Sequence, residues 1–312
     1  MAHPAPPGTP ATSSRTPAKK PARLALLLLG AVAPLTGCYS VKIRPVQKTI
    51  IVDNVRDVPL EDLLKTVQAN YDAVQTIYAK VQITASTGGA HAGEIKEIPT
   101  FSGYMFLRKP SDLRVLLQVP LLGSTALDMV TDGKEFKLSI PPKNKAVTGP
   151  ETITTPSAKG FENLRPNIIR DALQVPPVAP DEYVALTESS RILPSETKKH
   201  EMIEEPDYDL TVLGPKSGHV LERRRVIHMD RINLEPYEQD VFDSAGRLVT
   251  VINYSRYTKF GDVDFPTLIN IRRPIDEYSL KIDISKLTLN QKLDDEQFVL
   301  KFPEGVPVQT MK

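Results

Sequence analysis

The sequence predicts one α+β domain whose strands are mainly antiparallel. Short apolar segments separated by turn residues follow one another over most of the chain, a long amphipathic helix precedes them, and no internal repeat recurs at a fixed period. The 312 residues, 40% of them hydrophobic and 25% charged, are sufficient for a sizeable core. We therefore expect a large antiparallel sheet with helices packed on one side.

Residues 1–37 have the composition of a secretory signal. The first 23 residues contain basic but no acidic side chains, residues 24–29 form an apolar run, and small residues precede Cys38. The alternative is a transmembrane anchor, but the apolar stretch over residues 24–37 is shorter than the roughly 18 residues that a spanning helix needs. We expect this segment to be removed.

The segment Leu35-Thr36-Gly37-Cys38 resembles a bacterial lipobox, which is cleaved just before a lipid-modified cysteine. On this interpretation Cys38 carries acyl chains, such as palmitate, and anchors the protein to membrane lipid. The alternative is an unmodified thiol after an ordinary signal. The next residue is Tyr39 and not the aspartate typical of inner-membrane retention, so we expect an outer-membrane lipoprotein that faces the periplasm. Residues 38–57 would be a tether with a short extended piece.

The predicted mature domain spans residues 58–312 and begins with a helix of about five turns. Its apolar residues recur at helical spacing, namely Leu60, Leu63, Leu64, Val67, Tyr71, Val74 and Tyr78. A second helix is predicted over residues 161–173. Loops are expected at residues 88–99, 141–156 and 196–205. Strands are predicted at residues 81–87, 101–108, 113–119, 124–131, 135–140, 183–187, 208–213, 220–230, 238–242, 248–254, 267–272, 280–289 and 298–302.

Several predicted strands are apolar on both faces, whereas an antiparallel sheet with one wet face shows clean alternation. In residues 248–254, Leu248 and Ile252 oppose Val249 and Val251. Either both faces of the sheet are covered, or the sheet curls around an apolar interior. The sequence pattern leaves both interpretations open.

Catalytic and metal-binding motifs are absent from the sequence. It contains no GxSxG, P-loop, GxGxxG or CxxC pattern, so we predict neither an enzyme nor a cofactor. The 39 basic and 38 acidic residues argue against nucleic-acid binding, and one cysteine excludes a disulfide framework. Asp262 and Asp264 could ligate calcium but fit a solvated turn better. We interpret His91, His200, His219 and His228 as solvated or hydrogen-bonded structural residues.

Two segments resemble the Lol lipoprotein-localisation family, which comprises the periplasmic carrier LolA and the outer-membrane receptor LolB. Residues 113–125, with Pro120-Leu121-Leu122-Gly123-Ser124-Thr125, are similar to a receptor strand and its Pro-Leu-Gly-Ser-Thr loop, with one additional residue. Residues 287–303 resemble the closing strands of the carrier. In this family the leucine of the loop enters the membrane, so the resemblance assigns Leu121 and Leu122 to a membrane-inserting loop.

The resemblance implies a strongly curved, incomplete β-barrel with helices as a lid over an apolar cavity. It also implies that the cavity binds acyl chains of lipoproteins or lipids and assists their localisation to the outer membrane, and that a periplasmic carrier would dock on this protein. The residues expected to line the cavity are Phe101, Met105, Leu107, Leu113, Val115, Leu117, Phe136, Leu138, Val249 and Val251.

Two alternatives remain at this stage. Leu121 and Leu122 could be buried in the core, as most leucines are. The protein could also be a non-catalytic scaffold lipoprotein that uses the same fold to hold a partner in an envelope assembly. Its interior would then be filled by its own side chains.

Overall fold

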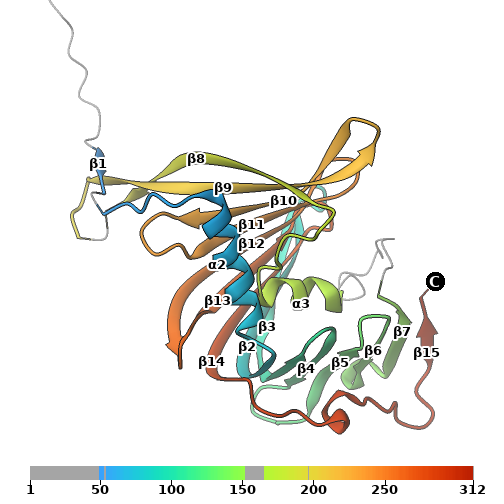
Figure 1. Ribbon diagram of the computed structural model, residues 1–312. Coiled ribbons are helices and arrows are strands. Elements are labelled where there is room, and N and C mark those ends of the chain that lie inside the picture. Colours follow the sequence, from blue (N-terminus) through green and yellow to red (C-terminus); the bar gives the residue numbers. More distant parts are fainter. Residues whose placement is uncertain (1–48, 53, 152–164, 196, 312) are drawn as a thin grey trace, which may run out of the picture. The chain divides into compact units, whose positions relative to one another are not determined.

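A computed structural model of the chain describes residues 49–52, 54–151, 165–195 and 197–311, and Gln47–Lys312 form one compact unit (Figure 1). The predicted signal segment and Cys38 lie outside the described residues. The unit contains the helices α2 (Leu60–Asp72) and α3 (Pro166–Leu173) and the 3-10 turns η2 (Pro141–Lys143) and η4 (Asp295–Phe298).

The strands form a single sheet. They are β1 (Thr49–Ile51), β2 (Thr76–Gly89), β3 (Glu94–Arg108), β4 (Asp112–Gln118), β5 (Thr125–Thr131), β6 (Glu135–Ile140), β7 (Lys145–Pro150), β8 (Tyr183–Pro194), β9 (Met202–Ser217), β10 (Val220–Asp230), β11 (Pro236–Phe242), β12 (Leu248–Phe260), β13 (Val263–Arg273), β14 (Tyr278–Leu289) and β15 (Val308–Thr310).

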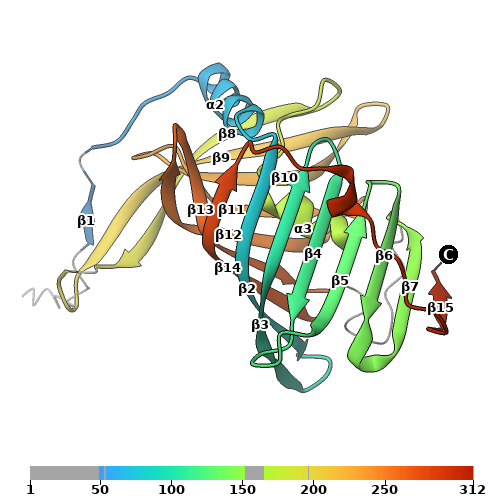
Figure 2. The same ribbon diagram turned by 90° about the horizontal axis from the view of Figure 1, so that it is seen from below.

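The sheet is strongly curved but does not close into a barrel. Its strand order is β1-β9-β10-β11-β12-β13-β14-β2-β3-β4-β5-β6-β7-β15, with β8 paired to β9. Neighbouring strands are antiparallel, except for the short parallel pairs β1–β9 and β7–β15. Figure 2 shows the change of strand direction along the sheet, from β9 and β10, which run across the view, to β4–β7, which run up and down it. The predicted fold class, a mainly antiparallel incomplete barrel with helices, is therefore confirmed.

Both helices lie inside the curl of the sheet, where two apolar clusters form the core (Figure 1). The larger cluster joins α3 to the inward side chains of β2–β7 and β12–β14. In the smaller one, Leu63 and Val67 of α2 pack on Tyr208, Ile227 and Met229 of β9 and β10. Side chains alternate between the faces of a strand, so one face of each strand enters a cluster.

Helix α2 is shorter than the predicted helix of about five turns, which is a correction to the sequence analysis. It ends at Asp72, and residues 76–78 belong to β2, since Thr, Ile and Tyr fit a strand better than a helix. The side chain of Asn290 accepts a hydrogen bond from the Gln75 N–H and donates one to the Ala73 carbonyl, each 2.7 Å long. A residue from the far end of the chain therefore fixes the end of the helix.

Other local predictions were also wrong, among them the loop expected at residues 196–205, because β9 already begins at Met202. The predicted loop at residues 88–99 is largely strand, because β2 continues to Gly89 and β3 starts at Glu94. The predicted loop at residues 141–156 contains η2 and β7. The predicted strand at residues 298–302 contains the end of η4 and irregular chain. The first residues of β3 are mostly exposed, so they lack the period-two apolar signal of a half-buried strand.

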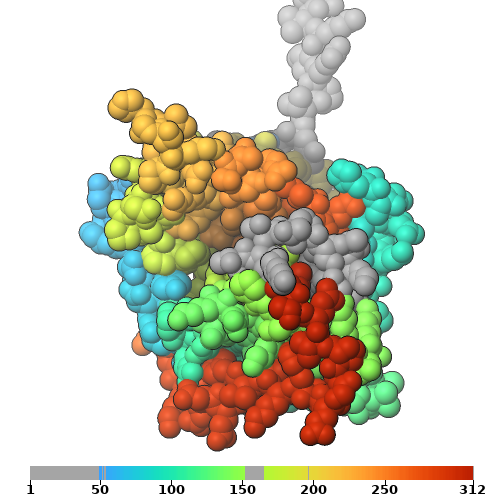
Figure 3. All heavy atoms as spheres, turned by 90° about the vertical axis from the view of Figure 1, so that its right-hand side faces the viewer, coloured from blue at the N-terminus to red at the C-terminus, as the bar shows by residue number. Residues whose placement is uncertain are grey.

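The C-terminal segment covers part of the outer face of β4. Arg108 donates hydrogen bonds to the Leu293 carbonyl and the Asp295 carboxylate, and Arg114 donates one to the Gln297 carbonyl. Beyond η4 the chain continues to β15, which pairs with β7; Figure 3 shows this red segment beside the green strands. Both possibilities raised by the two-sided apolar strands therefore apply, since the sheet curls around an apolar interior and its outer face is partly covered.

Candidate functional site

An apolar cavity of about 320 Å³ lies between α3, η2 and the concave face of the sheet. This volume is at the lower end of the range for small-molecule sites, roughly 300–1,000 Å³. Among the described residues, all that line it are apolar except Lys143. They are Ile83, Ala85, Ile98, Phe101, Val115, Leu117, Val119, Ala126, Leu127, Met129, Ile140, Pro142, Lys143, Ile169 and Leu280. The site therefore suits a ligand without polar groups.

Phe101, Val115 and Leu117, which the sequence analysis expected at the cavity, lie in its wall. Five others, Met105, Leu107, Leu113, Phe136 and Leu138, are almost fully buried in the larger core cluster and do not line the cavity. They belong to the same inward face but pack against other side chains, so that part of the curl is solid. The sequence pattern does not distinguish a packed core position from a position in the cavity wall, because both need apolar residues on the inward face of a strand.

Val249 and Val251 lie on the other face of the sheet, which corrects the expectation that they line the cavity. Ile252 packs in the larger core cluster, so the alternate positions of β12 point outward. Val251 is paired with Asp240 of β11 and Arg272 of β13. Both faces of β12 are apolar in sequence, and the choice between them depends on how the sheet curls.

Leu121 and Leu122 are exposed at the tip of the β4–β5 loop, with relative accessibilities of 107% and 78%. The loop is closed at its base, where Val119 donates a hydrogen bond to the Ser124 carbonyl (2.8 Å) and Gly123 donates one to the Val119 carbonyl (3.0 Å). Leu121 has a φ of +67°, which is uncommon for a residue other than glycine. The alternative that these leucines are buried in the core is therefore wrong.

The exposed tip and the cavity are parts of one continuous segment. Val119 precedes the loop and Ala126 follows it closely, and both line the cavity. An apolar ligand at the tip would thus be a few residues from the wall of the cavity. Val119 and Ala126 were not expected as lining residues, although both are apolar and flank the loop that the resemblance singled out.

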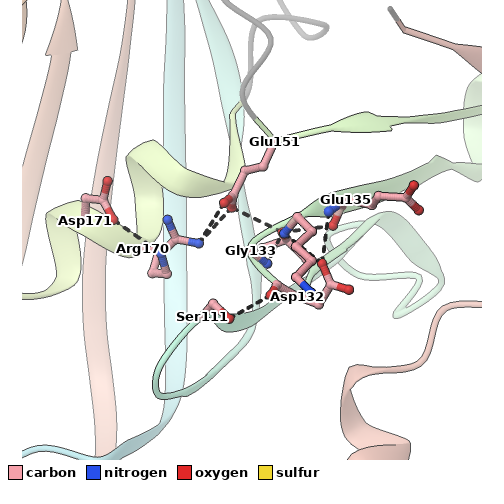
Figure 4. Close-up of polar contacts among 9 residues, drawn as sticks. Ser111, Asp132, Gly133, Glu135, Glu151, Arg170 and Asp171 are labelled. Carbon is pink, nitrogen blue, oxygen red and sulfur yellow. Dashed lines mark hydrogen bonds and ion pairs between the residues drawn. The ribbon is translucent and has the colours of Figure 1, made fainter.

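Helix α3 is held over the cavity by a buried ion pair, shown in Figure 4. Nη1 of Arg170 lies 2.8 and 2.9 Å from the two carboxylate oxygens of Glu151, whose side chain is only 6% exposed. Thr131 at the end of β5 donates a hydrogen bond to the same carboxylate. Ile169, the residue before Arg170, lines the cavity. The ion pair therefore connects the helical wall of the cavity to the β5–β6 hairpin.

A small cleft beside α3 contains Lys109, which follows β3. Its ammonium group donates a hydrogen bond to the Tyr71 carbonyl and lies 3.3 Å from the centroid of the Tyr71 ring. Burial disfavours the charged form and lowers the pKa of Lys109 from its usual 10.5 to about 8.

We expect the folded protein to gain stability as the pH rises from about 8 to 10, through this lysine. In that interval the unfolded chain binds a proton at Lys109 that the folded chain has lost, so the free energy of unfolding increases with pH. Urea unfolding across this range, compared between wild type and Lys109→Met, measures the effect. Equal pH slopes for the two proteins would contradict it.

No helix among the described residues is long and apolar enough to cross a membrane. Cys38, the predicted lipidation site, is not among those residues, so its modification stays a prediction.

Comparison with known proteins adds information on the fold. No protein-family model matches the chain, and no curated protein matches its sequence. The structure is similar to that of a DUF1329 family protein from Desulfovibrio piger, with a TM-score of 0.51 and 17% identity over 76% of this chain and 95% of that one. A LolA superfamily protein from Nitrosomonas europaea has a TM-score of 0.47 and 15% identity over 78% of this chain and 99% of that one.

At these identities the comparison shows the fold alone. Together with the unclosed curved sheet, the similarity to the DUF1329 family protein supports the incomplete, mainly antiparallel barrel that the sequence predicted.

Proposed function

We propose that this protein binds acyl chains of lipoproteins or lipids in its apolar cavity and assists their localisation to the outer membrane. The observation that carries the proposal is the continuity between the exposed leucines of the β4–β5 loop and the cavity wall. In this proposal Leu121 and Leu122 enter the lipid surface, and Phe101, Val115 and Leu117 contact the acyl chain. The protein has no catalytic role.

The physical basis of such a transfer is the cost of exposing hydrocarbon to water, roughly 25 cal/mol per Å². One water molecule takes up about 30 Å³ in the liquid, so a cavity of about 320 Å³ has room for about ten groups of that size. A methylene group has a similar size. The cavity therefore accepts part of a single acyl chain, which favours weak, reversible contact over permanent storage.

The proposed location is the periplasmic side of the outer membrane, with acylated Cys38 as the anchor. Residues 38–57 would then tether the domain at the membrane surface, where the leucine tip can reach lipid. A periplasmic carrier would deliver the cargo by docking here.

Site-specific photocrosslinking in intact cells tests the binding function with the full chain. A photoreactive residue at Val119, in the cavity wall, should crosslink to acylated proteins or lipids. The matched control is Leu116 of β4, the strand that ends just before Val119; its side chain points away from the inward face that Val115 and Leu117 share. No crosslink at position 119, or equal crosslinking at both positions, would argue for the scaffold alternative.

The loop tip gives a separate prediction. Leu121→Glu combined with Leu122→Glu should leave the fold intact, because neither side chain is buried. Each buried leucine contributes about 1.5–3 kcal/mol, so transfer of a fluorescent acylated peptide into vesicles that carry the protein should slow at least tenfold. The control is Leu221→Glu, at an exposed leucine of β10; with this variant the acylated peptide should be transferred at the wild-type rate. Unchanged transfer by the double variant would contradict the role of the tip.

A further inference from the structure

The outer face of β9, β10 and β11 carries a group of metal-ligating side chains that the proposed function does not use. His228 of β10 lies directly opposite Glu238 of β11, and Asp240 is two residues further along β11. Ile227 and Met229 point into the smaller core cluster, so His228 points the other way. One imidazole nitrogen and one oxygen from each carboxylate lie within 4.8 Å of one another.

The imidazole of His228 is held in a fixed orientation by a fourth residue. Its Nδ1 lies 2.7 Å from Oδ1 of Asp209, the residue opposite it on β9. A neutral imidazole that donates its Nδ1 proton to this carboxylate has its lone pair on Nε2. The same carboxylate–histidine arrangement orients metal-ligating histidines and raises their basicity.

The Nε2 atom is buried and has no hydrogen-bond partner. It lies 3.8 Å from the nearest oxygen of Asp240, which is too far for a hydrogen bond. An unpartnered buried nitrogen is costly unless something else satisfies it. A cation bound between Nε2 and the two carboxylates would satisfy it and would also balance their charges.

The second carboxylate is positioned in the same way. Asn253, opposite Glu238 on β12, donates a hydrogen bond to Oε2 of Glu238. Each of these two prospective ligands, His228 and Glu238, is therefore held by a polar residue on the next strand. Such support outside the ligands is characteristic of built metal sites.

We propose that His228, Glu238 and Asp240 bind a divalent cation of the zinc type and so clamp β10 to β11. Zinc takes nitrogen and carboxylate ligands at about 2.0–2.2 Å, which places tetrahedral ligand atoms about 3.5 Å apart. The three ligand atoms lie within 4.8 Å of one another, so they would move closer by up to about 1.3 Å to reach this geometry, and water would complete the coordination. Calcium and magnesium prefer all-oxygen sites with six or more ligands, so the imidazole disfavours them.

Calorimetric titration of the metal-stripped full chain in detergent with zinc sulfate tests the site. We expect one zinc ion per chain and a zinc-dependent rise in Tm. His228→Gln and the nearly isosteric Asp240→Asn should each weaken binding at least 100-fold. Asp209→Asn, which removes the supporting carboxylate, should weaken it about 10–100-fold.

His219→Gln is the matched control, because His219 is an exposed histidine in the turn before β10, and this variant should bind zinc like the wild type. Circular dichroism establishes whether each variant is folded. If His228→Gln does not fold, the zinc affinity of Asp240→Asn tests the proposal. Absence of stoichiometric binding, unchanged affinity in Asp240→Asn, or equal loss in His219→Gln would overturn the proposal. Displacement of zinc by millimolar magnesium would also overturn it.

Discussion

Arg170→Met is expected to destabilise the fold by about 3 kcal/mol, because it leaves the buried carboxylate of Glu151 without its cation. The Arg170 side chain is 19% exposed and that of Glu151 is 6% exposed, so water screens the pair only weakly. Breaking a buried ion pair from one side costs about 3–5 kcal/mol, and the partial exposure of Arg170 favours the lower end. Urea unfolding of the full chain measures the loss.

Two further variants separate charge from packing. Lys259→Met breaks an ion pair with Asp264 whose side chains are largely exposed, and it should change stability little. The double variant Arg170→Met with Glu151→Leu removes both charges and should regain most of the lost stability, because an apolar pair can replace a buried ion pair. A double variant as unstable as the single one would show that the arginine acts through packing and not through charge.

Local signals in the sequence were enough to predict several elements. The strand predicted at residues 220–230 is β10 with the same bounds, and Asp132-Gly133 marks the turn between β5 and β6. In each case the information lies within a few residues, as apolar alternation or as a turn dipeptide. The order of helix, meander and later strands was predictable for the same reason.

Contacts between distant residues decide what the sequence could not show. The end of α2 depends on hydrogen bonds with Asn290, which is 217 residues away from Ala73 in the sequence. Whether Ile252 or Val251 points inward depends on the direction in which the sheet curls. Both side chains are β-branched and apolar, so the alternation of side chains along this strand fits either face of the strand pointing into the core.

The same limit applies to the sites. His228 was interpreted from its neighbours in sequence, whereas its partners Asp209 and Asp240 come from two other strands. The described part of the cavity wall combines residues of α3, η2 and six strands, and of these only Phe101, Val115 and Leu117 were identified in advance. The tip of the β4–β5 loop was found only through the resemblance, since isolated leucines carry no signal of exposure.

Filling the cavity should strongly weaken the binding of acyl chains while the protein stays folded. In Ala126→Phe the new ring projects from the cavity wall beside the loop and occupies space that an acyl chain would need. Each methylene group excluded from the cavity costs about 0.8 kcal/mol of binding, so the loss of three or four groups weakens binding about 100-fold. Displacement of an apolar fluorescent probe by fatty acid, with the full chain in nanodiscs, measures the affinity.

The control for this substitution is Ala92→Phe, which adds the same ring at an exposed position in the β2–β3 turn. It should bind acyl chains with wild-type affinity. A ring in a preformed apolar space needs little rearrangement, so thermal unfolding of Ala126→Phe should occur near the wild-type temperature. Wild-type affinity in a folded Ala126→Phe protein would mean that acyl chains do not enter this cavity, and the leucine tip would then act on lipid alone.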